Sequence, residues 1–220
     1  AARGGTAVDR FARVRDRLRE RFRLRVVETD PTGEWRSAVW DAIRADGLRV
    51  VVAAGGDGTV HAVVNTLFDL GAPRGLVLGA IGLGSSNDYH KPVRAEIAGI
   101  PVRLDVANAR PRDLLLARWD RDGIAQREVV VVSASLGVTA AANAFFNRGD
   151  AILRVLKGRW TAGAIAYAAL RTLVTHPGSR GSVILEGERW SGSLANLSFL
   201  EAPYLSGSLR YDLPAAEDDG

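Results

Sequence analysis

The feature that most constrains this chain is an apolar run that ends in a glycine-rich turn and continues into a second apolar segment. Residues 48–54 read LRVVVAA, residues 55–59 read GGDGT, and residues 60–67 read VHAVVNTL. This order predicts a buried strand, a tight turn and the start of a helix. Glycines let the turn approach a ligand without a Cβ clash. The free N–H groups of the helix start favour anions such as phosphate.

A carboxylate, Asp57, stands at the centre of this turn. Bound phosphates repel a carboxylate unless a cation lies between them. The turn therefore predicts a site for a nucleotide with magnesium.

The first half of the chain alternates helical and strand-like patterns. Helical spacing of apolar residues predicts helices over 6–22, 35–47 and 60–70, and apolar runs predict strands over 24–27, 48–54 and 76–81. Continuous apolar strands between helices are typical of a parallel sheet covered on both faces. Ligands bind beyond the carboxyl ends of such strands. Two turns, 55–59 and 82–88, lie at such ends.

The pattern changes after residue 105. Strand-like segments 114–119 and 128–133 flank a turn at 120–123, and segments 182–186 and 189–200 flank a turn at 186–188. Between these pairs, residues 150–175 read as a helical insert. The sequence therefore predicts two domains: an α/β nucleotide-binding domain over 1–105 and a mainly antiparallel β domain over 106–220.

The second turn, 82–88, reads GLGSSND. Its glycines, hydroxyls, amide and carboxylate suit a phosphate and metal site. Ser85, Ser86 or Asn87 equally suit the N-cap of a helix. Both interpretations stand, and the presence of the first turn at the same sheet edge favours the phosphate site.

The composition excludes several kinds of functional site. The chain has 220 residues, of which 47% are hydrophobic, and no cysteine, which excludes disulfides, thiolate metal sites and cysteine nucleophiles. The three histidines fit no metal-ligand spacing. No apolar run of 18 residues exists, so we expect a cytoplasmic protein without a membrane span.

The net charge of +4 owes much to arginines near the N-terminus. They form either a solvated helix face or a patch for peripheral contact with an anionic membrane surface. No nucleic-acid motif accompanies them, so nucleic acid is not an expected partner. Whether two copies form a homodimer is left open.

Five motifs in order resemble the diacylglycerol kinase catalytic-domain family, which includes bacterial soluble lipid kinases and sphingosine kinases. They are GGDGT with Asn65 on the following helix, the GxGSxND loop, Leu104-Asp105-Val106, residues 134–137 (ASLG) and residues 214–220 (PAAEDDG). The GGDGT motif alone is shared with NAD kinases and, loosely, with phosphofructokinases.

The resemblance implies an N-terminal phosphofructokinase/NAD-kinase-like α/β domain and a C-terminal β-sandwich, with the active site in a cleft between them. It also implies a strand before Ala1, a longer loop between Asp88 and Asp105, and a general-base Glu downstream of Gly220.

The resemblance further implies an ATP-dependent lipid kinase that transfers the γ-phosphate to a diacylglycerol-like or sphingoid hydroxyl, with Mg²⁺. The catalytic acidic network would be Asp57, Asp88 and Asp105. A structural Mg²⁺ would be held by Asp219 and the carbonyl of Ala216, and Asp57 would hold the catalytic Mg²⁺ through water. The implied ATP contacts are Thr29, Gly55, Gly56, Asp57, Gly58, Thr59, Val60, His61, Ala62, Gly84, Ser85 and Asn87.

Two other functions compete with this one. An NAD kinase would share the nucleotide turn, and a non-catalytic homologue would bind nucleotide without transfer. The second is suggested by His61-Ala62 and Val132, where the family commonly has Asn-Glu and Asn. A set of apolar residues would either line a cleft for acyl chains or form plain core: Phe145, Phe146, Ile152, Leu156, Trp160, Ile165 and Tyr167.

Overall fold

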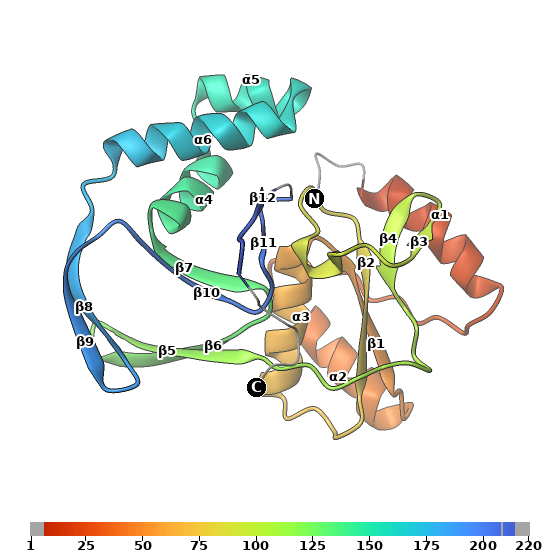
Figure 1. The fold of residues 1–220 in the computed structure, drawn as a ribbon. Coiled ribbons are helices and arrows are strands. Elements are labelled where there is room, and N and C mark those ends of the chain that lie inside the picture. Colours follow the sequence, from red (N-terminus) through yellow and green to blue (C-terminus); the bar gives the residue numbers. More distant parts are fainter. Residues whose placement is uncertain (1–6, 208, 214–220) are drawn as a thin grey trace. The chain divides into compact units, whose positions relative to one another are not determined.

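The structure is a computed structural model that describes residues 7–207 and 209–213 (Figure 1). The chain forms two compact units, the first from Ala1–Val132 and Glu201–Gly220, the second from Ser133–Leu200. The chain leaves the first unit and returns to it at one place, because the N–H of Glu201 donates to the carbonyl of Val132 at 2.9 Å. The second unit is thus an insertion between two adjacent backbone positions of the first.

A four-stranded sheet forms the centre of the first unit. Its strands are β1 (Val50–Gly55), β2 (Val77–Gly82), β4 (Ile100–Arg103) and β3 (Glu96–Ile97), in the order β1-β2-β4-β3. Strands β1 and β2 are parallel, whereas β4 is antiparallel to β2 and to β3. The two predicted strands are confirmed, but a wholly parallel sheet is wrong. The reason is that β4 follows β2 without the crossover helix that a parallel neighbour requires.

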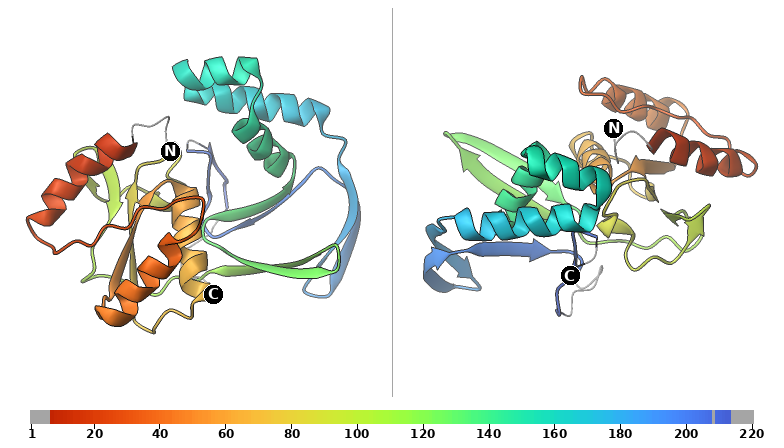
Figure 2. Two further views of the ribbon diagram at one scale, coloured as in Figure 1. Left: turned by 180° about the vertical axis from the view of Figure 1, so that it is seen from behind. Right: turned by 90° about the horizontal axis from the view of Figure 1, so that it is seen from above.

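Helices cover both faces of this sheet (Figure 2). The side chains of Ala80 and Ile81 point to opposite faces, as successive strand residues must. Ala80 packs with residues of α2 (Trp35–Ala45) and α3 (Asp57–Asp69), and Ile81 packs with residues of α1 (Ala7–Arg19). The three helices predicted for this half of the chain are confirmed, with ends shifted by a few residues.

The predicted strand over 24–27 does not form, and residues 23–30 have no regular structure. Leu24 packs against the cluster under α1, and Val27 packs against the cluster under α2 and α3. The apolar pattern of this segment therefore reflects two residues that pack on different faces of the sheet, and not a strand.

The rest of the first unit is built from small elements. Strands β5 (Leu115–Arg121) and β6 (Ile124–Val130) form the predicted hairpin around Asp122 and Gly123, both with positive φ. A single 3₁₀ turn, η2 (Asp88–His90), follows the second loop, and β11 (Tyr204–Leu205) pairs with β12 (Leu209–Arg210).

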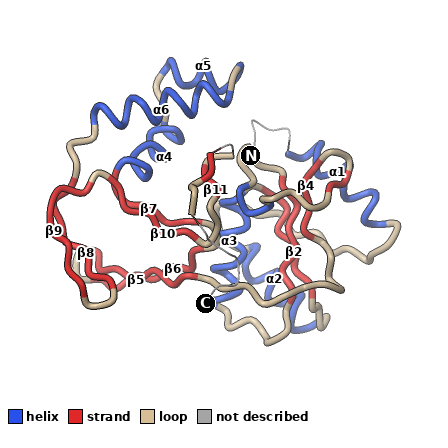
Figure 3. Tube along the Cα trace, viewed as in Figure 1, coloured by secondary structure: helices blue, strands red, loops and turns tan. Residues whose placement is uncertain are grey.

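The second unit combines two strand pairs and three helices (Figure 3). Its elements are β7 (Ser133–Gly137), α4 (Val138–Arg148), α5 (Ala151–Arg159), α6 (Thr161–Thr175), β8 (Ser179–Leu185), β9 (Glu188–Leu194) and β10 (Asn196–Leu200). The helical insert is confirmed but begins earlier than predicted, at Val138. The predicted strand 189–200 is two strands, since β9 pairs with β8 and β10 pairs with β7.

The fold is therefore mixed α/β. Outside the four-stranded sheet, the strands of the described residues pair two by two. The C-terminal β-sandwich and the domain boundary after residue 105 stay predictions, because a compact unit is not by itself an independently folding domain. Within the described residues, no helix has both the length and the apolar character that a membrane crossing requires.

Leu153, Ala164 and Ala168 form the core of the helical part of the second unit. Four of the apolar residues considered for an acyl-chain cleft pack against this core: Phe145, Phe146, Leu156 and Tyr167. Ile152 and Trp160 are instead 56% and 64% exposed. The set thus divides into core residues and surface residues.

Candidate functional site

The glycine turn and the second loop meet at one edge of the sheet. Strands β1 and β2 end in register at Gly55 and Gly82, and the N–H of Leu83 donates to the Gly55 carbonyl at 2.8 Å. One residue further, Gly56 and Gly84 touch backbone to backbone. A Cβ added to Gly84 would lie 2.5 Å from the Cα of Gly56. Only glycine at these positions allows the two turns to come this close.

Helix α3 begins directly at this contact. Its N-cap residue is Gly56, in an extended conformation, and no side chain caps the helix. The N–H groups of Thr59 and Val60 donate to the Gly56 carbonyl, and those of Asp57 and Gly58 precede these first bonds of the helix. The start of α3 therefore presents uncapped backbone donors and the positive end of the helix dipole, a combination that favours an anion.

Asp57 connects the two turns. Its Oδ1 accepts a hydrogen bond from the N–H of Tyr89 at 2.9 Å. Its Oδ2 accepts no hydrogen bond from the described residues. One carboxylate oxygen thus holds the second loop, and the other keeps its capacity for a water or a cation.

Asn87 fixes the shape of the second loop. It has positive φ (50°), and its Oδ1 accepts from the Gly84 N–H at 2.9 Å. Its Nδ2 donates to the carbonyls of Gly82 and Gly84 at 3.2 and 3.1 Å. The side chain of Asn87 does not cap the 3₁₀ turn that follows. Its amide is engaged within its own loop, and Ser85 beside it is exposed.

Asp88 is buried and engaged. Its carboxylate accepts hydrogen bonds from the Lys91 ammonium at 2.7 Å and from the Gly207 N–H at 2.9 Å. Asp57 and Asp88 therefore lie on touching loops, joined through the backbone of Tyr89, which follows Asp88 directly.

Among the other predicted site residues, Asp105 lies apart from this contact. Strand β4 runs antiparallel, so Arg103 pairs with Ala80 and the chain then leads Asp105 away from the edge at Gly82. Asp105 is exposed and bonded to Asn108. Thr29 is exposed in the irregular segment 23–30. Asp219 and Ala216 lie outside the described residues.

The second turn of α3 binds the hairpin strand β6. His61 Nε2 lies 2.7 Å from Glu128 Oε1. Asn65 accepts from the Val129 N–H at 2.7 Å and donates to the Val129 carbonyl at 2.9 Å, as a neighbouring strand would. No motif in the sequence pointed to Glu128, because its partner is 67 positions earlier in the chain.

A buried histidine and several arginine side chains lie next to the second loop. The sequence motifs did not indicate these residues. His90 is 2% exposed, and neither ring nitrogen has a hydrogen-bond partner among the described residues. Burial has the largest effect and lowers the pKa of His90. The positive charge of Arg103 lowers it further, against the opposing effects of the Ala80 backbone and of Asp57.

The ring of Tyr89 lies near two guanidinium groups, with Arg103 at 5.2 Å and Arg112 at 4.7 Å from its centroid. From α1, Arg10 donates to the carbonyls of Leu83 and Gly82 at 2.9 and 3.3 Å. The second loop and the Tyr89 that follows it are therefore contacted by three arginines.

The donor set suits magnesium rather than a metal held entirely by protein. The described residues contain no group of three or more histidine and carboxylate side chains placed to hold a metal ion. Mg²⁺ keeps several waters and takes one or two carboxylates together with substrate phosphates. Asp57, with one oxygen unengaged beside an anion-favouring helix start, fits that requirement.

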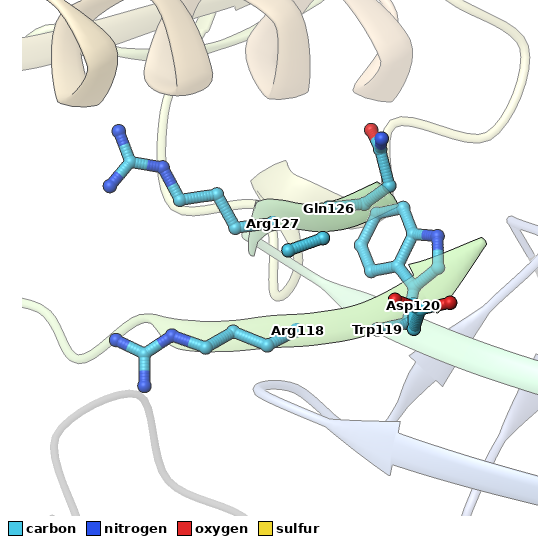
Figure 4. A pocket seen from close by; sticks show the side chains of 6 residues that line it. Arg118, Trp119, Asp120, Gln126 and Arg127 are labelled. Atoms are coloured by element: carbon cyan, nitrogen blue, oxygen red, sulfur yellow. The ribbon is translucent and has the colours of Figure 1, made fainter. Parts of the chain in front are cut away.

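A concave surface on the β5–β6 hairpin shares no residue with the two turns (Figure 4). It is lined by Arg118, Trp119, Asp120, Ala125, Gln126 and Arg127. The candidate site is therefore defined by the meeting of the two turns and not by this hollow.

Comparison with known families identifies the first half of the chain. The family model described as the diacylglycerol kinase catalytic domain matches residues 1–114, which include both turns and helix α3. Among curated proteins, no sequence similar to this chain is found.

Proposed function

Because this chain belongs to the diacylglycerol kinase catalytic-domain family, we propose that it transfers the γ-phosphate of ATP to a lipid hydroxyl. The acceptor is proposed to be a diacylglycerol-like or sphingoid lipid. The observation that carries the proposal is the backbone contact between Gly56 and Gly84, which brings the start of α3 and the carboxylate of Asp57 to one edge of the sheet.

The glycine turn would bind the phosphates of ATP. Backbone N–H groups at the start of α3 are uncapped, and Gly56 and Gly58 carry no Cβ that would keep a phosphate away. Thr59, Val60, His61 and Ala62 continue the same helix, and Gly84 lies against the turn. Phosphoryl transfer depends mainly on such positioning and on neutralising charge.

Asp57 would hold the catalytic Mg²⁺ through water, using the oxygen that Tyr89 leaves unengaged. When bound, the ion supplies neutralisation of the charge that develops on the phosphate oxygens. Asp105, which is exposed and bonded to Asn108, is proposed as a further member of the acidic network. Asp88 is left out of this network, because Lys91 and Gly207 already engage its carboxylate. The proposal assigns no general base to the described residues.

The proposed partners are the lipid and an anionic membrane surface. Of the arginines on α1, Arg10 is half-buried and donates to carbonyls of the second loop. Arg13, Arg17 and Arg19 are exposed. Membrane contact through this helix would therefore depend on the three exposed side chains, each contributing about 1 kcal/mol near an anionic surface.

The test is a transfer assay with labelled ATP, in which diacylglycerol, sphingosine and NAD are offered separately to the full chain. We expect label in a lipid, and turnover at least about 100-fold lower for Asp57→Asn. Asparagine keeps an oxygen that can accept from the Tyr89 N–H. A loss of turnover in this variant therefore measures the effect of removing the negative charge. Asp69→Asn is the matched control, because Asp69 lies on the exposed end of α3 and should leave turnover unchanged.

Two results would contradict the proposal. Label in NAD alone would identify an NAD kinase. ATP binding without transfer to any acceptor would identify a non-catalytic nucleotide-binding protein.

A further inference from the structure

The segment that returns to the first unit after Glu201 is fastened to the second loop. It forms the small ribbon of β11 and β12, with Ser206 and Gly207 at its turn. The N–H of Gly207 donates to both carboxylate oxygens of Asp88, at 2.9 and 3.3 Å, across 119 positions of sequence. A buried carboxylate of the second loop thus binds the backbone of the returning segment directly.

Lys91 completes this attachment from the same loop. Its ammonium donates to Asp88 Oδ1 at 2.7 Å and also to the carbonyl of Gly207. Its Nζ also lies 5.7 Å from the centroid of the Tyr204 ring, in β11. The side chains of Lys91 and Asp88 are only 17% and 10% exposed, so solvent screens this charge pair weakly.

The backbone of the returning segment is shaped for this contact. Gly207 has a φ of +86°, which L side chains rarely adopt, and a Cβ there would lie 3.3 Å from the Cα of Ser86. Glycine therefore satisfies both the conformation and the close approach to the loop.

We infer that Asp88, Lys91 and Gly207 form a latch that holds the returning segment on the second loop, and that Asp88 is thereby a positioning residue for the nucleotide turn. The coupling runs along the backbone, because Tyr89 follows Asp88 and donates its N–H to Asp57. Holding Asp88 in place through Lys91 and Gly207 therefore also holds in place the Tyr89 N–H that Asp57 accepts. The effect on catalysis rests on the proposed function, whereas the latch itself does not.

A role for Asp88 in binding magnesium predicts the opposite effect of removing the Lys91 charge. An ammonium 2.7 Å from the carboxylate neutralises it and repels a divalent cation. If Asp88 acted on the metal, removing the Lys91 charge would improve metal binding. If Asp88 acts as part of the latch, removing that charge loosens the segment and lowers function.

Hydrogen exchange of the full chain, followed peptide by peptide, tests the latch. Lys91→Met keeps most of the aliphatic stem and loses the ammonium, and Gly207→Ala disturbs the contact without touching either charge. We expect each to speed exchange of residues 204–207 by about tenfold or more, as loss of a charge-assisted hydrogen bond implies. Exchange of the Tyr89 amide should rise as well.

Lys91→Arg should restore much of the protection, because it restores the charge. Lys157→Met is the control, since Lys157 also contacts an aromatic ring and a carbonyl but lies in the second unit. It should leave exchange of residues 204–207 unchanged. Unchanged exchange there in both Lys91→Met and Gly207→Ala would overturn the latch.

Turnover separates positioning from metal binding. We expect Lys91→Met and Gly207→Ala to lower kcat without changing the Mg²⁺ concentration for half-maximal activity. A Mg²⁺ requirement that falls in Lys91→Met would overturn the positioning role and assign Asp88 to the metal. If the unmodified chain transfers phosphate to nothing, the proposed function fails, and the exchange results still decide the latch.

Discussion

At the scale of single residues, the site depends on glycines, which have no side chain. Gly56 and Gly84 make the closest approach between the two turns, and their role follows from the missing Cβ atoms. The sequence motif indicated glycines for ligand approach. The structure adds that one pair of them is required for the two turns to meet at all.

The first prediction concerns this contact. Gly84→Ala places a Cβ 2.5 Å from the Cα of Gly56, so the two backbones must separate. We expect the free energy of unfolding to fall by about 1–3 kcal/mol, as for other overpacked sites. Urea unfolding measures it. Gly58→Ala is the control, because nothing lies within 4 Å of the added Cβ, and it should not destabilise the protein. Equal effects of the two substitutions would contradict the account.

The second prediction concerns His90. Because burial holds its pKa below the ordinary value of about 6.5, the folded chain keeps it neutral while the unfolded chain takes up a proton. The free energy of unfolding should therefore fall as the pH drops below about 6.5, until the lowered folded pKa is reached. His90→Leu removes this titration and should flatten the dependence below about pH 6.5. Parallel curves for the two proteins in urea unfolding would show that His90 does not contribute.

At the scale of elements, helix α3 organises the first unit. Asp57, His61 and Asn65 stand four residues apart and therefore share one face of the helix. They bind, in turn, the second loop, Glu128 and the backbone of Val129. The helix that begins at the candidate phosphate site thus also holds the β5–β6 hairpin.

The third prediction tests this attachment. Asn65→Ala leaves both the N–H and the carbonyl of Val129, which is 2% exposed, without their partner. We expect a loss of at least about 2 kcal/mol in the free energy of unfolding, since each orphaned buried group costs about 1–3 kcal/mol. One turn later, Asp69→Ala breaks only an exposed pair with Arg127, and about 0–1 kcal/mol is expected. Similar losses for both variants would contradict the role of Asn65 in attaching the hairpin to α3.

Elements with a clear period were predictable, and elements defined by distant partners were not. Helices α1, α2 and α3 and strands β1 and β2 follow from apolar spacing and from the glycine turn. The segment 24–27 shows the limit, because its apolar residues pack on two different clusters without a strand neighbour. The antiparallel direction of β4 and the pairing of β10 with β7 depend on contacts that local sequence does not encode.

The candidate site divides in the same way. Both turns and Asp57 could be identified from motifs, because their chemistry is local. Glu128, His90 and the engagement of Asp88 by Gly207 could not, since each arises where segments distant in sequence meet. The placement of Asp105 follows from strand direction, which the motif does not specify.

At the scale of the whole molecule, the second unit is inserted through a single crossing point. Val132 and Glu201 are hydrogen-bonded neighbours within the first unit, and Ser133 and Leu200 pair within the second. The covalent connection between the units therefore consists of two chain segments that lie side by side.

The fourth prediction follows from this crossing. Replacing residues 133–200 by a short glycine–serine linker should leave the first unit folded, because its two ends already lie next to each other. We expect the shortened chain to bind MgATP, seen as a ligand-dependent rise in Tm, and to lose lipid phosphorylation. A chain that unfolds on this replacement would show that the first unit depends on the second for its stability.

The crossing also bears on how the protein is made. Ribosomes release the chain from its N-terminus, so residues 133–200 emerge before Gly207 can reach Asp88. Until then, the Asp88 carboxylate and the Lys91 ammonium lack their hydrogen bonds to Gly207. The inserted helices and ribbons can thus fold before Gly207 reaches Asp88, so the order of synthesis separates folding of the second unit from closure of the latch.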